Sequence, residues 1–165
     1  MTDTHHLAFA SITEADVPAL TGVMTRAFDD DAQKHLRQER GGPEGYDDGG
    51  FFRQWLFGYP QTQGYQALHQ GEPIAAVIVW ILPKGDNIVG TIFVDPAHQD
   101  RGVGTALWQF VEATYPHTRS WRLVTPEWAT KNHHFYQAKC GFERVDSDPI
   151  VGDEADGLVF RKEMV

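Results

Sequence analysis

The spacing of apolar residues near the N-terminus predicts a strand followed by an amphipathic helix. The run Leu7–Ser11 is typical of a first strand. Thr13 and Asp16 follow it with the spacing of a helix N-cap and its capping partner. The next apolar residues recur on one helical face, namely Val17, Leu20, Met24, Ala27 and Phe28. We therefore expect a helix that packs against a sheet.

The next part of the chain changes from polar to strongly apolar. Residues 32–40 are predicted to continue as a polar helix, and Gly41 to Gly50 holds five glycines, a proline and three acids, which is typical of a mobile loop. The apolar cluster at 51–56 predicts a short helix. Two apolar runs, 64–70 and 73–82, joined around a Gly-Glu turn, predict a β-hairpin.

The second half of the chain alternates between strands and helices. Strands are predicted at 88–94 and 121–125, with a helix from Val103 to about Thr114 between them. That connection is long enough to make the two strands parallel. A terminal strand pair is predicted at 142–147 and 158–164, around an acidic loop. The whole pattern predicts one α/β domain over 1–165, with a mixed, mostly antiparallel sheet, a central parallel strand pair and flanking helices.

The segment between the strand at 88–94 and the following helix suggests an anion site. Gly102 and Gly104 open the helix, and the N–H groups of a first helical turn have no partners within the helix. The helix dipole adds partial positive charge there, and glycine allows a ligand to approach closely. A phosphate or pyrophosphate fits such a site. The segment lacks the Gly-Lys-Ser/Thr ending of a Walker loop and the third glycine of a Rossmann fingerprint.

Two motifs resemble a known family. Gln99-x-x-Gly102-x-Gly104, after Val94-x-Pro96, resembles the coenzyme A pyrophosphate loop of the GNAT N-acetyltransferase superfamily. Asn132-His-His-Phe-Tyr136 with Lys-Cys-Gly-Phe at 139–142 resembles the second GNAT hallmark, and the segment Gly-Gly-Pro-x-Gly-Tyr-Asp at 41–47 matches a small subgroup. The resemblance covers essentially the whole chain.

The resemblance implies an acetyl-CoA site. Its implied coenzyme-binding residues are Phe93, Val94, Gln99, Asp100, Arg101, Gly102, Val103, Gly104, Thr105, Asn132 and Tyr136. The Val94 N–H is the implied oxyanion donor, and Tyr136 is the implied acid for the leaving thiolate, with a core aromatic as the alternative. Tyr136 lies five residues before Gly141, whereas the commoner pattern has four; a π-bulge can absorb the extra residue. Asn132 contacts the coenzyme or else caps its helix.

The acceptor side is less clearly marked. Glu44, Tyr46 and Asp47 in the Gly-rich loop, together with Glu127, are the candidate substrate-binding residues. The general base is undetermined among the carboxylates Glu44, Asp47, Asp48 and Glu127 and the histidines His133 and His134. The alternative interpretation of each of these groups is a solvated surface side chain without a role in catalysis.

Composition narrows the function classes. The net charge of −9 and the absence of a Lys/Arg-rich tract argue against nucleic acid as a partner. The single cysteine excludes an internal disulfide and suits a cytoplasmic location. No apolar run is long enough for a membrane span, the first residues predict no signal peptide, and no paired-ligand spacing predicts a metal. A homodimer stays open.

Together these features predict an acetyl-CoA-dependent N-acetyltransferase without a metal. The acceptor is a small-molecule or peptide primary amine that the sequence does not identify. The alternative is a non-catalytic module that binds acyl-CoA as a sensor or partner. Both readings retain the pyrophosphate loop, and only turnover of an amine separates them.

Overall fold

A seven-stranded sheet organises the chain. The computed structural model describes residues 6–153 and 157–164. Residues 1–5, 154–156 and 165 lie outside it, so the signal-peptide prediction for the first residues and the acidic loop fall partly outside the described residues. The strand order is β1-β2-β3-β4-β5-β9-β6. These strands are β1 (Leu7–Ser11), β2 (Thr62–His69), β3 (Glu72–Trp80), β4 (Asp86–Val94), β5 (Ser120–Thr125), β6 (Glu143–Val145) and β9 (Leu158–Glu163). The short strands β7 (Ser147–Asp148) and β8 (Gly152–Asp153) form a separate pair.

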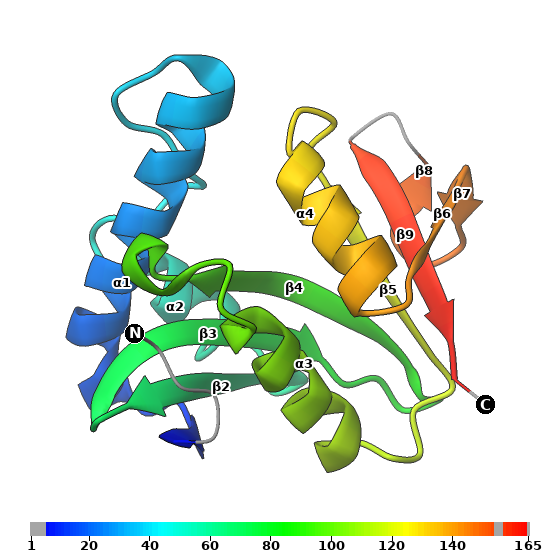
Figure 1. Cartoon of the computed structure of the whole chain (residues 1–165). Helices are drawn as coiled ribbons and strands as arrows, with labels where there is room; N and C mark the ends of the chain where they lie inside the picture. Colours follow the sequence, from blue (N-terminus) through cyan, green and yellow to red (C-terminus); the bar gives the residue numbers. More distant parts are fainter. Residues whose placement is uncertain (1–5, 154–156, 165) are drawn as a thin grey trace.

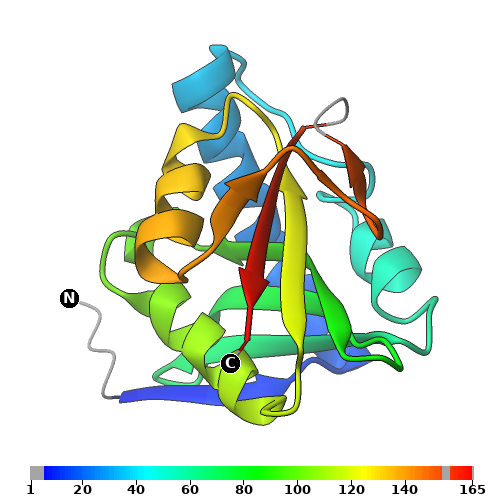
Figure 2. The ribbon, with the colours of Figure 1, turned by 90° about the vertical axis from the view of Figure 1, so that its right-hand side faces the viewer.

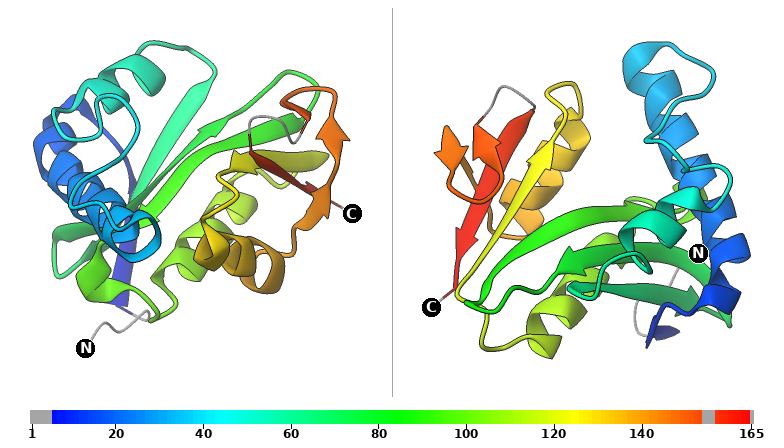
Figure 3. Two further views of the ribbon diagram at one scale, coloured as in Figure 1. Left: turned by 90° about the horizontal axis from the view of Figure 1, so that it is seen from above. Right: turned by 180° about the vertical axis from the view of Figure 1, so that it is seen from behind.

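Helices cover both faces of the sheet. The α-helices are α1 (Val17–Asp31), α2 (Gly50–Trp55), α3 (Val103–Thr114) and α4 (Thr130–His134). Two π-helices extend α1 and α4, namely η3 (Ala32–Leu36) and η5 (Phe135–Lys139). The 3₁₀ turns are η2 (Glu14–Asp16) and η4 (Pro96–His98). Seen from behind, α1 and α2 lie against one face of β2–β4, while α3 lies on the other (Figure 3).

The buried apolar side chains form two clusters, one on each face of the sheet. One joins α3 and η5 to the sheet through side chains such as Leu107, Trp121 and Phe160. The other joins α1 and α2 to the sheet through side chains such as Leu20, Phe52 and Phe93. Because successive side chains of a strand point to opposite faces, β4 contributes to both clusters.

The central strands β4 and β5 are parallel and then separate. They pair from Asp86↔Ser120 to Ile88↔Arg122, and the other pairs of the seven-stranded sheet are antiparallel. The expected mixed sheet with one parallel pair is therefore confirmed. Beyond Ile88 the strands diverge into a V, which Figure 1 shows between the green and yellow strands. The β5 side of β4 is thus an unpaired backbone edge over its last residues.

A buried charge cluster lies where the two strands separate. The Arg122 guanidinium donates from Nη1 to the Asn87 carbonyl (3.2 Å) and pairs through Nε with Asp148 Oδ1 (2.9 Å). Neither side chain of this ion pair is more than 1% exposed. Figure 2 shows β5 (yellow), β9 (red) and β6 (orange) side by side on this flank. The cluster ties β4, β5 and β7 together at the base of the V.

Several element boundaries differ from the sequence-based ones. The polar continuation of α1 ends as a single π-helix at Leu36, because Arg37 adopts a left-handed conformation with φ 52°. The terminal strand pair is shorter than predicted on its first strand, since the chain turns after Val145 into the β7–β8 pair. The predicted Thr13–Asp16 capping interaction is present, with the Thr13 N–H donating to Asp16 Oδ2 at 2.8 Å.

Candidate active site

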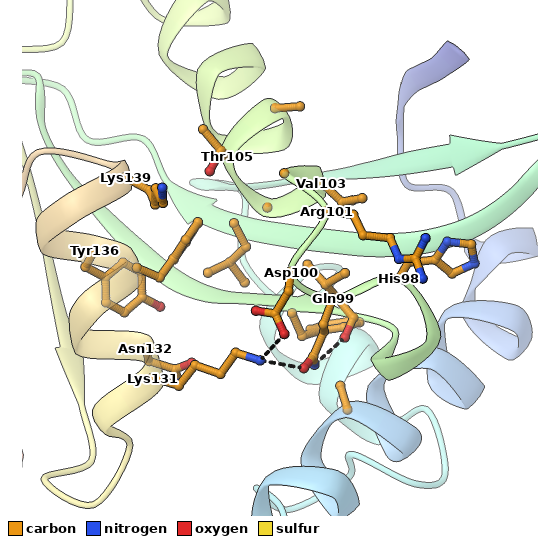
Figure 4. Close-up of a pocket in the computed structure, with 18 of the residues that line it drawn as sticks. His98, Gln99, Asp100, Arg101, Val103, Thr105, Lys131, Asn132, Tyr136 and Lys139 are labelled. Carbon is orange, nitrogen blue, oxygen red and sulfur yellow. Dashed lines mark hydrogen bonds and ion pairs between the residues drawn. The ribbon is translucent and has the colours of Figure 1, made fainter. Parts of the chain in front are cut away.

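A large cavity lies in the V between β4 and the α4–η5 segment. Its volume is about 720 Å³, within the range of small-molecule sites. It is lined by the end of α1, the end of β4, the 98–106 segment and one face of α4–η5 (Figure 4). Every residue that the sequence implied for coenzyme binding lines this cavity: Phe93, Val94, Gln99, Asp100, Arg101, Gly102, Val103, Gly104, Thr105, Asn132 and Tyr136.

The loop that opens α3 is fixed at its start by an ion pair. Asp95 Oδ1 accepts the Ala97 N–H (3.1 Å), and Arg26 Nη2 of α1 contacts Asp95 Oδ2 at 2.6 Å. Burial alone would raise the pKa of Asp95, but the Arg26 and Ala97 hydrogen bonds hold that pKa below its usual value. The loop ends at Gly102, the N-cap of α3, whose φ of 80° favours glycine.

The start of α3 presents unpaired backbone donors. Glycine has no side chain that could cap the helix, so the N–H groups of its first turn are free of side-chain caps. The first intrahelical bond runs from the Ala106 N–H to the Gly102 carbonyl (3.0 Å). This geometry matches the anion site predicted from the glycine spacing.

Gly104 lines the cavity at the start of α3, beside Phe135 of η5. A Cβ at this position would lie 3.2 Å from two ring carbons of Phe135 and 3.6 Å from Val94 Cγ2. The missing side chain therefore lets the start of α3 approach η5 closely. The expected close approach of a ligand to Gly104 stays a prediction.

Gln99 and Lys131 connect the two sides of the cavity. Gln99 Nε2 donates to the Val94 carbonyl (3.1 Å), and Lys131 Nζ of α4 reaches Gln99 Oε1 (3.2 Å) and Asp100 Oδ2 (3.1 Å). Figure 4 shows these contacts as dashed lines. Both partners of the Lys131–Asp100 pair are largely exposed, so the pair itself adds little stability.

Tyr136 lies deep in the cavity within the π-helix η5. The Cys140 N–H donates to the Phe135 carbonyl (3.2 Å), five residues back, which shows that the predicted π-bulge absorbs the extra residue before Gly141. The ring is 8% exposed, and Figure 4 shows the hydroxyl turned into the cavity. Burial raises the pKa of Tyr136 well above its ordinary value. Within the described residues its hydroxyl has no hydrogen-bond partner, so it is free to donate to a ligand.

The other candidate site residues of α4 differ in whether they line the cavity. Asn132 and His134 line the cavity. Asn132 is the third residue of α4, whose N-cap is Ala129, so the capping alternative for Asn132 is wrong. His133 instead contacts the Pro126 carbonyl through Nε2 (2.8 Å) and packs beside Phe160.

Helix α1 contributes to the cavity, which the sequence patterns did not predict. Ala27, Phe28 and Asp31 line it from the side opposite α4. Burial raises the pKa of Asp31, with only partial compensation from His35. The apolar periodicity identified Ala27 and Phe28 as packing residues, and only knowledge of the V could place them at a ligand site. Further lining residues were missed as well, namely His98, Lys131 and Lys139.

The acceptor candidates are scattered by the fold. Glu44 lines a second cavity, described below. Tyr46 is 8% exposed and packs in the α1–α2 cluster, and its hydroxyl donates to Asp29 Oδ1 (2.6 Å). Asp47 pairs with Arg40 (3.1 Å), and Glu127 is exposed in the turn after β5. Neither cavity includes Tyr46, Asp47 or Glu127 among its lining residues.

The Gly-rich loop is anchored by these polar contacts. Asp29 Oδ1 also accepts the Gly41 N–H (3.1 Å), and the Tyr46 carbonyl accepts the Thr25 hydroxyl (3.1 Å). Asp48 Oδ1 accepts the Gly50 N–H (2.8 Å). The loop that was predicted to be mobile is therefore held against α1 at Gly41 and Tyr46, and its end is closed by the hydrogen bond between Asp48 and Gly50.

The described residues contain neither a metal-ligand cluster nor a membrane-spanning helix. Over residues 6–153 and 157–164, no group of three or more His, Cys, Asp or Glu side chains is arranged to hold a metal ion. In the same ranges no helix combines the length and apolar character that a membrane crossing requires.

The V-shaped sheet, the uncapped helix start and the buried tyrosine meet at one cavity that suits a phosphate-bearing ligand. The sequence profile of the acetyltransferase (GNAT) family matches residues 25–142. The chain therefore belongs to the acetyltransferase (GNAT) family, and it carries the acyl-CoA N-acetyltransferase domain of that family.

Solved structures share the fold over nearly the whole chain. An acetyltransferase from Thermus thermophilus has a TM-score of 0.74 and 20% identity, covering 96% of this chain and 97% of that one. The ribosomal-protein-S18-alanine N-acetyltransferase of Escherichia coli has a TM-score of 0.72 and 17% identity, covering 96% of each chain. The PaiA N-acetyltransferase of Thermoplasma acidophilum, in complex with coenzyme A, has a TM-score of 0.71 and 12% identity, covering 96% and 99%.

A curated relative covers less of the chain. The uncharacterized protein YrkN of Bacillus subtilis (strain 168) is 33% identical over 91 residues, which are 54% of this chain and 49% of that protein. The chain thus spans about half the length of the curated relative that it matches.

Proposed function

We propose that the chain transfers an acetyl group from acetyl-CoA to a primary amine by direct attack. The observation that carries this proposal is the cavity that joins the free helix start, an unpaired strand edge and a buried tyrosine. The acetyl-CoA-binding residues are those that the sequence implied on the loop, β4 and α4–η5. The assignment to the Asn-His-His-Phe-Tyr subgroup stays a prediction from those motifs.

The pyrophosphate is proposed to bind the N–H groups of the Gln99–Thr105 segment. Helix dipoles and free N–H groups stabilise anions there. The three cations Arg101, Lys131 and Lys139 outnumber the two lining acids, Asp31 and Asp100, in the same cavity, although the chain as a whole carries a net charge of −9. This local reversal of charge supports a polyanionic ligand.

The pantetheine arm is proposed to pair with the free edge of β4. The Asp95 N–H donates to Ile74 of β3, and successive residues of a strand point their N–H groups in opposite directions. The Val94 N–H therefore faces the V, and so does that of Ile92, two residues deeper. The thioester is the end of the arm farthest from the pyrophosphate, so it lies beyond Val94 toward Ile92. The Val94 N–H is the oxyanion donor that the resemblance implies. In this arrangement the Ile92 N–H either shares that role with Val94 or takes it alone.

Each atom of the proposed reaction has an assigned destination. The amine loses one proton to a base, and its nitrogen attacks the thioester carbonyl carbon to form the N–C bond. A backbone N–H stabilises the developing oxyanion. The C–S bond then breaks, and the Tyr136 hydroxyl protonates the departing thiolate. As the amide forms, the nitrogen loses its second proton, which restores the Tyr136 phenol, so that one proton is released overall from the ammonium substrate. The raised pKa of Tyr136 keeps the phenol protonated at neutral pH, as an acid requires.

Calorimetry and thiol release test the proposal together. Lys131→Gln and Lys139→Gln should each weaken acetyl-CoA binding by about threefold to tenfold, with a shallower salt dependence, because each removes a cation from the cavity. Lys84→Gln, in the exposed β3–β4 turn, is the matched control and should bind normally. Unchanged affinity in both cavity variants would contradict the assigned site.

An amine panel separates catalysis from simple binding. Acetyl-CoA binding with release of free thiol in the presence of an amine supports transfer. Binding without thiol release for any amine of the panel would assign the chain to the non-catalytic alternative.

A further inference from the structure

A second cavity lies on the opposite face of the sheet from α3. Its volume is about 430 Å³, and it lies between the loop before α2, α2 itself and strands β3 and β4. Its lining residues are Pro43, Glu44, Phe51, Gln54, Trp55, Ile78, Trp80, Gly90 and Thr91. This volume suits a small organic molecule or a single side chain.

The two cavities meet the same strand at successive residues. The coenzyme cavity contacts β4 at Ile92–Val94, and the second cavity contacts it at Gly90 and Thr91. The β3–β4 register shifts at this point, which leaves Gly90 without a partner in β3. Because β5 leaves β4 after Ile88, a group that runs along the free edge from Val94 arrives beside the second cavity.

Aromatic rings form the walls of the second cavity. Trp55 stacks on Tyr59 with ring centroids 5.7 Å apart, and Tyr59 lies 4.9 Å from Trp80. Tyr59 thus holds the two lining indoles in place from outside the cavity. A Cβ on Gly90 would come within 3.2 Å of the Ile78 carbonyl, so the glycine keeps the floor of the cavity open beside Trp80.

The charge on the lining of the second cavity is negative. Glu44 is the only charged side chain among its described lining residues, and Gln54 and Thr91 are neutral. Indole faces attract cations, and a carboxylate attracts an ammonium group. The walls therefore favour a flat apolar body that carries a single positive charge.

We propose that this cavity binds the acetyl acceptor, and that the acceptor is an arylalkylamine. Its ring packs against the Trp55 and Trp80 side chains, its ammonium group is drawn in by Glu44, and its nitrogen reaches the β4 edge at Gly90–Thr91. The inference rests on the proposed acetyl transfer. It adds to that proposal the chemical class of the acceptor.

The same chemistry rejects two other classes of amine. A free amino acid brings a carboxylate next to Glu44, and no cation among the described lining residues compensates for it. A polyamine has no aromatic body to pack against Trp55 and Trp80, and the single lining carboxylate, Glu44, can pair with only one of its ammonium groups. Losing hydration without a partner costs several kcal/mol for such a charge.

Steady-state kinetics with three probes test this selectivity. At fixed acetyl-CoA, phenethylamine should have a kcat/KM at least about tenfold above that of either phenylalanine or putrescine. A preference for phenylalanine or putrescine would overturn the inference and leave acetyl transfer intact.

Variants of the walls link this selectivity to the cavity. Trp80→Leu and Glu44→Gln should each raise the KM for phenethylamine about tenfold while the KM for acetyl-CoA stays unchanged. Glu72→Gln, an exposed carboxylate at the β2–β3 turn, is the control for lost charge. Unchanged acetyl-CoA affinity shows that each variant is folded. If neither KM moves in the cavity variants, the acceptor binds elsewhere.

A binding measurement separates this inference from the transfer reaction itself. Calorimetry of phenethylamine with the coenzyme A-saturated protein needs no turnover. Binding that Trp80→Leu weakens, without thiol release, would support the cavity and contradict the transfer. Thiol release with phenethylamine that is insensitive to Trp80→Leu would support the transfer and contradict the cavity.

Discussion

The rings of His35 and Trp128 pack 5.8 Å apart and join the two walls of the coenzyme cavity. His35 belongs to η3 at the end of α1, and Trp128 lies in the turn before α4. Asp31 and Lys131, on the same two elements, line the cavity itself. The ring contact therefore fixes the spacing of the walls at the outer end of the V.

Trp128→Ala should loosen this end of the cavity. Aromatic contacts contribute about 0.5–1.5 kcal/mol, which corresponds to a rise in the acetyl-CoA Kd of about twofold to tenfold. Phe57→Ala is the matched control, since Phe57 and Trp128 are both 38% exposed and Phe57 lies after α2, outside the cavity. Calorimetry that finds equal acetyl-CoA affinity in both variants would show that the contact has no influence on the site.

Tyr136→Phe should lower kcat by about 100-fold with little change in acetyl-CoA affinity. The ring stays in the core, and only the hydroxyl that faces the cavity is removed. Because the pKa of Tyr136 is raised, the wild-type kcat should not fall between about pH 8 and pH 10 through loss of this proton. Tyr65→Phe is the control, because the Tyr65 hydroxyl bonds to Tyr115 outside the cavity.

A normal kcat in Tyr136→Phe would leave the thiolate to be protonated by another group. That conclusion requires chemistry to be rate-limiting, which a single-turnover experiment establishes. The stability of the variant, measured by thermal unfolding, separates a lost proton donor from a disturbed core.

Local patterns were sufficient to predict the elements of the fold. The glycine spacing at 102–104 identified the helix start, and the length of the crossover predicted the parallel pairing of β4 and β5. The five-residue interval between Tyr136 and Gly141 predicted the π-bulge. These features depend on neighbours in the sequence, so periodicity and turn chemistry are enough to reveal them.

The acceptor side depends on contacts between distant segments. Tyr46 looked like an exposed aromatic in a flexible loop, but its hydroxyl donates a hydrogen bond to Asp29 on α1, which fixes the ring in the core. Trp55 and Trp80 looked like ordinary apolar residues of a helix and a strand until the fold placed both on one cavity. No local pattern carries information of this kind.

The stability of the protein should fall above about pH 9 because of Cys140. Burial raises the pKa of this thiol from its ordinary value of 9.0 to about 12, and the nearby Glu112 carboxylate adds to the shift. Between these values the unfolded chain has lost the proton that the folded chain retains. The free energy of unfolding therefore decreases as the pH rises, by up to about 1.4 kcal/mol per pH unit.

Urea unfolding at about pH 7 and pH 10 measures this effect. Cys140→Ala changes packing at both pH values, so the comparison is the loss of stability between them. That loss should be smaller in the variant than in the wild type. The buried Tyr136 phenol acts in the same direction above about pH 10, so some loss should persist. An identical loss in both proteins would show that the thiol does not contribute.

Asp148→Asn should destabilise the protein more than any surface charge change. Asp148 is fully buried, and its carboxylate pairs with the buried Arg122 and the partly exposed Arg161. Burial opposes ionisation of Asp148, but the Ile150 N–H and the Arg122 guanidinium hold its pKa below the usual range. Removal of this charge leaves Arg122 buried without compensation at the point where β4 and β5 separate.

Breaking a buried pair on one side costs about 3–5 kcal/mol. The stability of Asp148→Asn, measured by urea unfolding at neutral pH, should fall by that amount. Glu163→Gln removes the 65%-exposed partner of Arg161 and should cost less than about 1 kcal/mol. The double variant Arg122→Met/Asp148→Leu removes both charges and should recover much of the loss, since apolar replacements avoid the cost of burying ions. A double variant as unstable as Asp148→Asn would instead show that the hydrogen bond from Arg122 to the Asn87 carbonyl, and not the ion pair, holds the V at its base.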